Sequence, residues 1–162
     1  MTAVDVQRKA LSRELVADLR RLDAALARNS EDIAAAVNAA GTSVTQIHGV
    51  GPVLAAKIIG YSGAVERFPS RHHYASYCGT APIEASSGEQ RRHRLSRAGN
   101  RQLNRAVHLV AVCQIRTNGP GREFYQRKLG EAKTPAEARR ALKRRLCDTI
   151  YRHLVQDHQS TT

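Results

Sequence analysis

The fold of this chain is decided by the stretch Thr45-Gln46-Ile47-His48-Gly49-Val50-Gly51-Pro52-Val53-Leu54-Ala55-Ala56-Lys57-Ile58-Ile59. An apolar residue precedes Gly-x-Gly, and a proline then opens a run of apolar and small residues. Glycines allow a tight turn and a close approach of two backbones. Proline is favoured at the first position of a helix because its missing N–H needs no partner there. The stretch predicts a hairpin that leads directly into a helix.

This hairpin resembles the helix-hairpin-helix motif, in which backbone N–H groups at the start of the second helix hold a phosphate. We therefore expect Gly49 and Gly51 to lie against a DNA backbone. The alternative is a corner that only joins two packed helices, for which the same glycines are equally suited.

Apolar residues before the hairpin recur at alternating steps of four and three, as in the seam of a heptad repeat. The seam comprises Leu15, Leu19, Leu22, Leu26, Asn29, Ile33 and Ala36. Charges of both signs flank it, which is typical of solvated coiled-coil positions. We expect a coiled-coil-like helix within residues 1–43 that forms a homo-oligomer through residues 10–40. The alternative is an amphipathic helix packed on its own domain.

After the hairpin, Ser70 is placed to cap a short helix that ends at Gly79. Residues 80–95 lack helical periodicity and contain a proline and a glycine. We expect them to form an irregular loop or a small β-hairpin that carries Ser86 and Ser87 near its tip.

A further helix is predicted from about residue 99 to residue 116. Its buried stripe is formed by Leu103, Ala106, Val107, Val110, Ala111 and Gln114. On the opposite side, basic residues recur at steps of four and three and form what we call the basic ridge: Arg97, Arg101, Arg105 and His108. No acidic residue occurs between Gln90 and Gly121, which favours an anionic partner over a merely solvated face.

Thr134, Pro135 and Glu137 form a capping box that starts the last helix. Its apolar stripe is Ala138, Ala141, Leu142, Leu146, Ile150 and Leu154. Cations are expected to cover its exposed side: Arg139, Arg140, Lys143, Arg144, Arg145 and Arg152. We expect a mainly α fold with a main domain at 44–157 and a disordered tail at 158–162.

A net charge of +12 over 162 residues is most simply explained by a polyanionic partner. The sequence has neither an apolar run that would span a bilayer nor a signal peptide, so we expect a cytoplasmic, nucleoid-associated protein that binds DNA and no membrane. Only 5 Tyr and 2 Phe are present, which favours arginine contacts to phosphates over base stacking. The 3 widely spaced cysteines predict neither a disulfide framework nor a zinc site.

A Ser86-Ser87-Gly88 turn is followed closely by Arg91, Arg92 and Arg94. A hydroxyl beside several guanidinium groups is a candidate nucleophile for a phosphodiester, because fixed cations offset the charge that develops on the phosphate. The alternative is a solvated turn in which the serines have no chemical role.

Taken in order, these motifs resemble the carboxy-terminal region of the bridge-RNA-guided insertion-sequence transposases, the IS110-type or DEDD family. The likeness covers roughly residues 10–155 and includes a Tyr-x-Gly-x-Ala-Pro loop and a Gly-Asn-Arg-x-Leu-x-Arg helix start. It implies a guide RNA as partner and a serine nucleophile at Ser87 that joins covalently to DNA, with Ser86 as the alternative. The positions that match its basic segment and following helix are Arg91, Arg92, Arg94, Gly99, Asn100 and Arg101.

Full-length members of that family carry an amino-terminal RuvC-like domain, whose four acidic residues bind divalent metal. The acids nearest the serines here are Glu84 and Glu89, and two single carboxylates do not make a two-metal site. We expect no cofactor in this chain, Mg²⁺ in the missing RuvC-like domain, and no catalysis by the chain alone. It would then be a truncated derivative, a split-gene product or an expressed domain. The alternative function is a non-catalytic helix-hairpin-helix DNA-binding module.

Overall fold

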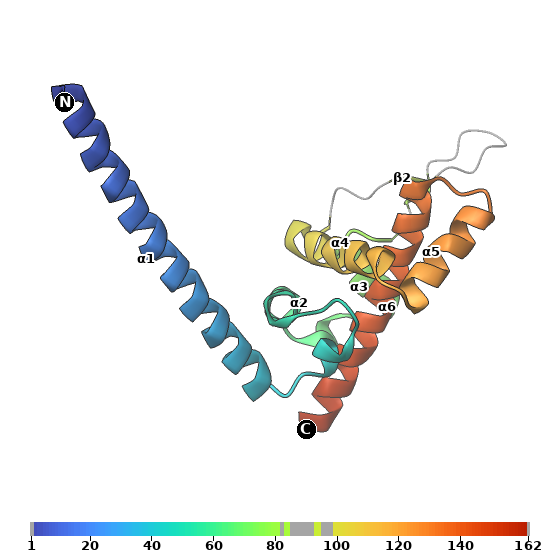
Figure 1. Cartoon of the computed structure of the whole chain (residues 1–162). Coiled ribbons are helices and arrows are strands. Elements are labelled where there is room, and N and C mark those ends of the chain that lie inside the picture. The colour runs from blue at the N-terminus through green and yellow to red at the C-terminus, as the bar shows by residue number, and fades with distance from the viewer. Residues whose placement is uncertain (1, 82, 85–92, 95–98, 162) are drawn as a thin grey trace.

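The computed structural model describes residues 2–81, 83–84, 93–94 and 99–161. In chain order, with η for 3₁₀ helices, its elements are α1 (Ala3–Ala39), η1 (Ser43–Gln46), α2 (Pro52–Ser62), η2 (Val65–Arg67), α3 (Arg71–Tyr77), β1 (Ile83–Glu84), β2 (His93–Arg94), α4 (Arg101–Arg116), α5 (Pro120–Gly130) and α6 (Pro135–Thr161). The predicted mainly α fold is confirmed (Figure 1). None of the helices in the described part of the chain is long and apolar enough to cross a lipid bilayer.

Helix α1 is an arm that leads away from the other helices and meets them only near its C-terminal end (Figure 1). Val37 is its one buried residue among those described. The leucines of the seam lie in solvent, with exposed fractions of 54% at Leu15, 59% at Leu19 and 65% at Leu26. The leucines of the seam therefore do not pack on their own domain, whereas Ile33 near its C-terminal end packs against the core. Self-association through the seam stays a prediction.

Replacing Leu19 and Leu22 together by Asp is expected to convert an oligomer into a smaller species. Charges on a heptad seam must be desolvated when two helices pair, whereas exposed charges cost the isolated arm little. Sedimentation velocity measures the change, and an unaltered melting temperature of the body serves as the control. A wild-type chain that is monomeric at high concentration contradicts the coiled-coil interpretation.

The remaining helices enclose one core in which α6 is central. The fully buried side chains of this core include Ile58, Tyr74, Leu103, Val107, Leu142 and Ile150. Local sequence signals start the helices where expected: Ser70 accepts a hydrogen bond from the N–H of His72, and Thr134 and Glu137 form the capping box. All 3 cysteines are free thiols, and two of them, Cys78 and Cys147, are buried. This agrees with the prediction of no disulfide framework.

The C-terminal part of α6 differs from the expected disordered tail, because the helix continues to Thr161. The Asp157 carboxylate accepts hydrogen bonds from the Thr42 hydroxyl (2.6 Å) and from the Ser43 N–H (2.9 Å). One residue further, His158 Nε2 lies 2.7 Å from the Glu66 carboxylate. These contacts to η1 and η2, which are far away in sequence, hold the last turns of α6.

Strands β1 and β2 pair antiparallel, with Ile83 opposite Arg94 and Glu84 opposite His93. This pairing agrees with the predicted small β-hairpin. The tip, with the candidate nucleophiles Ser86 and Ser87, lies outside the described residues.

Candidate nucleic-acid interface

The two ends of the segment 80–98 meet at one point beside the start of α4. Gly79 ends α3 with a positive φ of 65°. A Cβ added to Gly99 would overlap the backbone N and Cα of Gly79 and would lie 2.9 Å from the carbonyl oxygen of Tyr77. The Asn100 N–H donates to that same carbonyl at 2.6 Å. Gly79 and Gly99 therefore lie directly against each other, and we call this close approach the foot of the segment 80–98.

Both polar atoms of the Asn100 side-chain amide have hydrogen-bond partners within the protein. Its Oδ1 accepts from the N–H groups of Gln102 (3.0 Å) and Leu103 (3.1 Å), which caps α4. Its Nδ2 donates to the Tyr77 hydroxyl at 3.2 Å. An N-cap of this kind satisfies backbone donors that otherwise lack a partner. Asn100 thus has a structural role at the foot, while its contact to DNA stays a prediction.

One helical turn later, Asn104 holds the foot from the other side. Its Nδ2 donates to the carbonyl oxygens of Cys78 (2.9 Å) and Gly79 (3.0 Å). Its Oδ1 accepts from Lys143 Nζ at 2.7 Å. This network joins the C-terminal end of α3 with α4 and α6 at the foot.

The position of Lys143 corrects the sequence analysis, which placed it on the exposed cationic side of the last helix. Lys143 is only 8% exposed, and burial lowers its pKa. Its partner Asn104 is 39 residues away, so helical periodicity alone cannot tell this lysine from its exposed neighbours. The one local hint was Asn104 itself, a polar residue one turn after Asn100 beside the buried stripe of α4.

The basic ridge is partly solvent-exposed as predicted. Arg101 and Arg105 are exposed on α4, and neither forms an ion pair with another described residue. His108 is half-buried; burial lowers its pKa, and the nearby charges of Lys143 and Arg139 lower it further. Arg97 lies outside the described residues. The ridge thus presents two unpaired arginines next to the foot.

The hairpin at Gly49 and Gly51 is fixed against the C-terminal end of α4. Gly49 has a φ of 86°, and a Cβ there would lie 3.2 Å from the Cys113 side chain, which is a close approach that favours glycine. Gln114 Nε2 donates to the carbonyl oxygen of His48 at 2.7 Å. Gly51 is exposed and precedes Pro52, the first residue of α2, as predicted. The element before the hairpin is the short η1 rather than an α-helix, and phosphate binding here stays a prediction.

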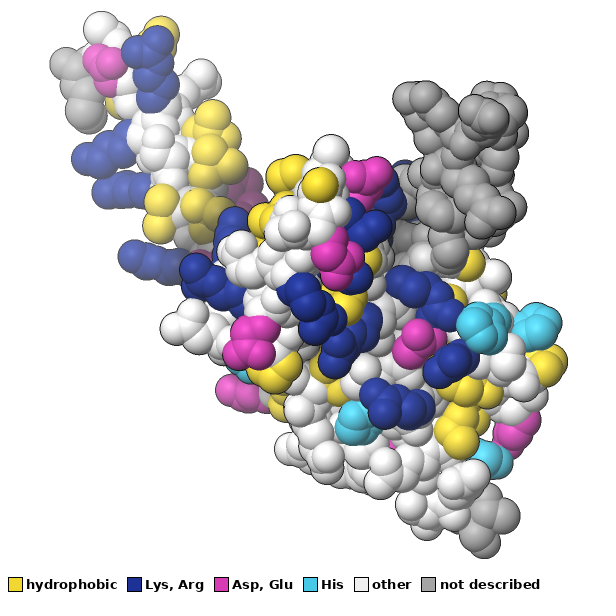
Figure 2. Space-filling view, turned by 90° about the vertical axis from the view of Figure 1, so that its right-hand side faces the viewer, with side chains coloured by type: hydrophobic (Ala, Val, Ile, Leu, Met, Phe, Trp, Pro, Cys, Tyr) yellow, Lys and Arg dark blue, Asp and Glu magenta, His cyan; other side chains and the backbone are white. Residues whose placement is uncertain are grey.

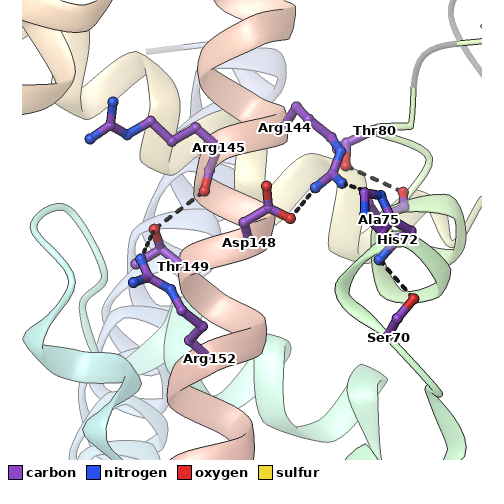
Figure 3. A network of polar contacts seen from close by, with 9 residues as sticks. All are labelled: Ser70, His72, Ala75, Thr80, Arg144, Arg145, Asp148, Thr149 and Arg152. Carbon is purple, nitrogen blue, oxygen red and sulfur yellow. Dashed lines mark hydrogen bonds and ion pairs between the residues drawn. The ribbon is translucent and has the colours of Figure 1, made fainter.

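Arginines and lysines also spread over the face toward which α5 lies, with acidic residues between them (Figure 2). Several cations of α6 have partners within the protein. Arg144 pairs with Asp148 and contacts His72 Nδ1 at 3.1 Å (Figure 3). The Arg145 guanidinium lies 5.0 Å from the centre of the Phe124 ring. The outer face of α6 is therefore less free to bind phosphates than its sequence indicates.

The candidate nucleophiles and most of the basic segment lie outside the described residues: Ser86, Ser87, Arg91 and Arg92. Arg94 belongs to β2, without a described side chain. Within the described ranges, no three His, Cys, Asp or Glu side chains gather into a group that would hold a metal ion.

Comparison with known proteins gives a consistent family. The model of the family described as "Transposase IS116/IS110/IS902 family" matches residues 41–126, which is more than half of the chain. The "Insertion element IS110 uncharacterized 43.6 kDa protein" of Streptomyces coelicolor is 34% identical over 109 residues, covering 67% of this chain and 27% of the relative. The IS900 protein of Mycobacterium paratuberculosis is 31% identical over 117 residues, covering 71% and 29%. The chain therefore spans under a third of the length of these relatives.

Proposed function

Because this chain belongs to the IS116/IS110/IS902 transposase family, we propose that it is the DNA-binding and strand-exchange part of an insertion-sequence transposase, with Ser87 as the nucleophile. The observation that carries the proposal is the place of the exposed arginines. Arg101 and Arg105 start α4 beside the foot of the segment that contains Ser87, and the family match includes the whole region.

The proposed chemistry is a transesterification at a DNA phosphodiester. The Ser87 Oγ forms a bond to phosphorus, the bond from phosphorus to one sugar oxygen breaks, and the protein stays linked to DNA as a phosphoserine ester. Arg91, Arg92 and Arg94 would stabilise the charge on the non-bridging oxygens. A serine hydroxyl is a weak nucleophile at neutral pH and needs a group that takes its proton. We propose that the group that takes this proton belongs to the RuvC-like domain of the family.

The proposed partners follow from the same family membership. They are DNA, a guide RNA, and a second copy of the chain through residues 10–40, in the cytoplasm at the nucleoid. The net charge of +12 supports the two nucleic-acid partners, and the exposed leucines of α1 support the third. Mg²⁺ is proposed for a RuvC-like domain of the family.

DNA binding by the basic ridge is tested by replacing Arg101 and Arg105 together by Ala. The slope of log K against log salt falls by about 0.9 for each phosphate contact that is lost, so we expect a slope smaller by roughly one to two units on any duplex sequence. Fluorescence anisotropy with a labelled duplex at several salt concentrations measures it.

The matched control replaces Arg13 and Arg20 by Ala, since both lie on the α1 arm and carry the same total charge. An unchanged slope in the α4 variant, or an equal loss in both variants, contradicts the ridge assignment. Binding without any covalent product, even beside the metal-binding domain, would instead favour the non-catalytic helix-hairpin-helix module.

A further inference from the structure

Aromatic residues are few in this chain, but the fold gathers most of them around α3. The rings of Phe68 and Tyr74 meet edge to face at 5.1 Å between centroids, and Phe68 and Tyr77 lie 5.2 Å apart. Tyr74 also contacts Tyr151 of α6 at 5.7 Å. Phe68 and Tyr74 are buried, whereas Tyr77 is half-buried and forms the outer edge of the cluster.

An exposed arginine lies over this outer edge. The guanidinium carbon of Arg67, in η2, is 4.6 Å from the centroid of the Phe68 ring and 4.5 Å from that of Tyr77. Arg67 forms no ion pair with a carboxylate among the described residues. The carboxylate of the neighbouring Glu66 pairs with His158 instead. Contact with two rings holds a guanidinium in place without neutralising its charge. The N–H groups of Arg67 that do not face the rings are thus already oriented to bind an anion.

The Tyr77 hydroxyl connects this arginine to the start of α4. It donates to the carbonyl oxygen of Tyr61 at 3.2 Å, and Arg67 Nη2 points to the same carbonyl at 3.5 Å. The Tyr77 hydroxyl also accepts a hydrogen bond from Asn100 Nδ2. Hydrogen bonds from Asn100 and Arg67 lower the pKa of Tyr77. Asn100 caps α4 and directly precedes Arg101 of the basic ridge. One chain of side-chain contacts therefore runs from η2 to the foot of the segment 80–98.

We propose that Arg67, held by Phe68 and Tyr77, binds a phosphodiester of DNA and extends the basic ridge from α4 onto η2. The inference rests on the proposed function and adds to it a DNA contact from η2. A phosphate fits better than a carboxylate of a protein partner, because Tyr77 and Asn100 link Arg67 to the residue before the exposed Arg101, in a chain of net charge +12.

The test measures the salt dependence of duplex binding for three variants of the full chain. Arg67→Ala is expected to reduce the slope of log K against log salt by about 0.9, the value for one phosphate contact. Arg67→Lys keeps the charge but loses the planar stacking group, so its slope stays near the wild-type value while its affinity falls. Tyr77→Phe keeps the ring and removes the hydroxyl link, and it is expected to weaken binding without changing the slope.

Arg20→Ala on the α1 arm is the matched control for the loss of one charge, and circular dichroism checks that each variant is folded. An unchanged slope in Arg67→Ala, an equal loss in Arg20→Ala, or a loss seen with an RNA hairpin and not with the DNA duplex would overturn the inference. If the wild-type chain binds no DNA, both this inference and the proposed function are wrong. A loss confined to Arg67→Ala on DNA, with the Arg101 and Arg105 variant unaffected, supports the Arg67 contact and contradicts only the ridge on α4.

Discussion

Gly99→Ala is expected to destabilise the body by about 3 kcal/mol, near the upper end of what overpacking usually costs. The added methyl would overlap the backbone of Gly79, which cannot move like the end of a flexible side chain. Relief would require the foot to open, and this would break the hydrogen bond from Asn100 N–H to Tyr77. For a chain of this length the melting temperature falls by roughly 6–12 °C. Thermal unfolding followed by circular dichroism measures it.

Gly60→Ala is the matched control, since Gly60 lies inside α2 and a Cβ there would meet no atom within 4 Å. Alanine is favoured over glycine in a helix interior, so this variant is expected to be neutral or more stable. If Gly99→Ala melts like the wild-type chain, the close approach of the two glycines is wrong.

Ser87→Ala is expected to abolish the covalent protein–DNA product when the chain acts together with a RuvC-like domain of the family, Mg²⁺ and guide RNA. The methyl group has no oxygen to form the bond to phosphorus, so the loss is complete rather than graded. The product is a slow band on a denaturing gel. The isolated wild-type chain should give no such band although it binds DNA.

Ser86→Ala is the control for this experiment because it removes the same hydroxyl one residue away, and it should keep the band. The reverse pattern would assign the nucleophile to Ser86. A band that persists in both variants would contradict the serine mechanism for this chain and leave its DNA binding intact.

The elements that the sequence predicted well depend on short-range signals. The capping box at Thr134 and Glu137 and the cap at Ser70 involve residues no more than three positions apart, so their partners can be read directly from the sequence. The apolar stripe of α4 also follows from local periodicity, and its residues Leu103, Val107 and Val110 are buried. Family motifs added the expectation of a functional loop between residues 80 and 98.

The features that sequence reasoning missed depend on partners from distant elements. Helical periodicity does not distinguish Lys143 from Arg139 and Arg140. Its burial is explained by the hydrogen bond from its Nζ to Asn104 of α4. Sequence reasoning also gave no sign that the side-chain amide of Asn100 would join the Tyr77 hydroxyl to the first turn of α4. Arg67 had no motif at all, because its two aromatic contacts exist only after η2 and α3 have packed together.

The hydrogen bond between Thr42 and Asp157 joins residues that are 115 positions apart, and this affects how the protein is made. At usual translation speeds of about 5–20 residues per second, roughly 6–23 s separate the synthesis of the two partners. During this time η1, α2 and α3 emerge without α6, so apolar side chains such as Tyr74 lack part of their final cover. The nascent body is therefore expected to depend on chaperones until α6 leaves the ribosome, whereas the α1 arm can form its helix from local contacts alone.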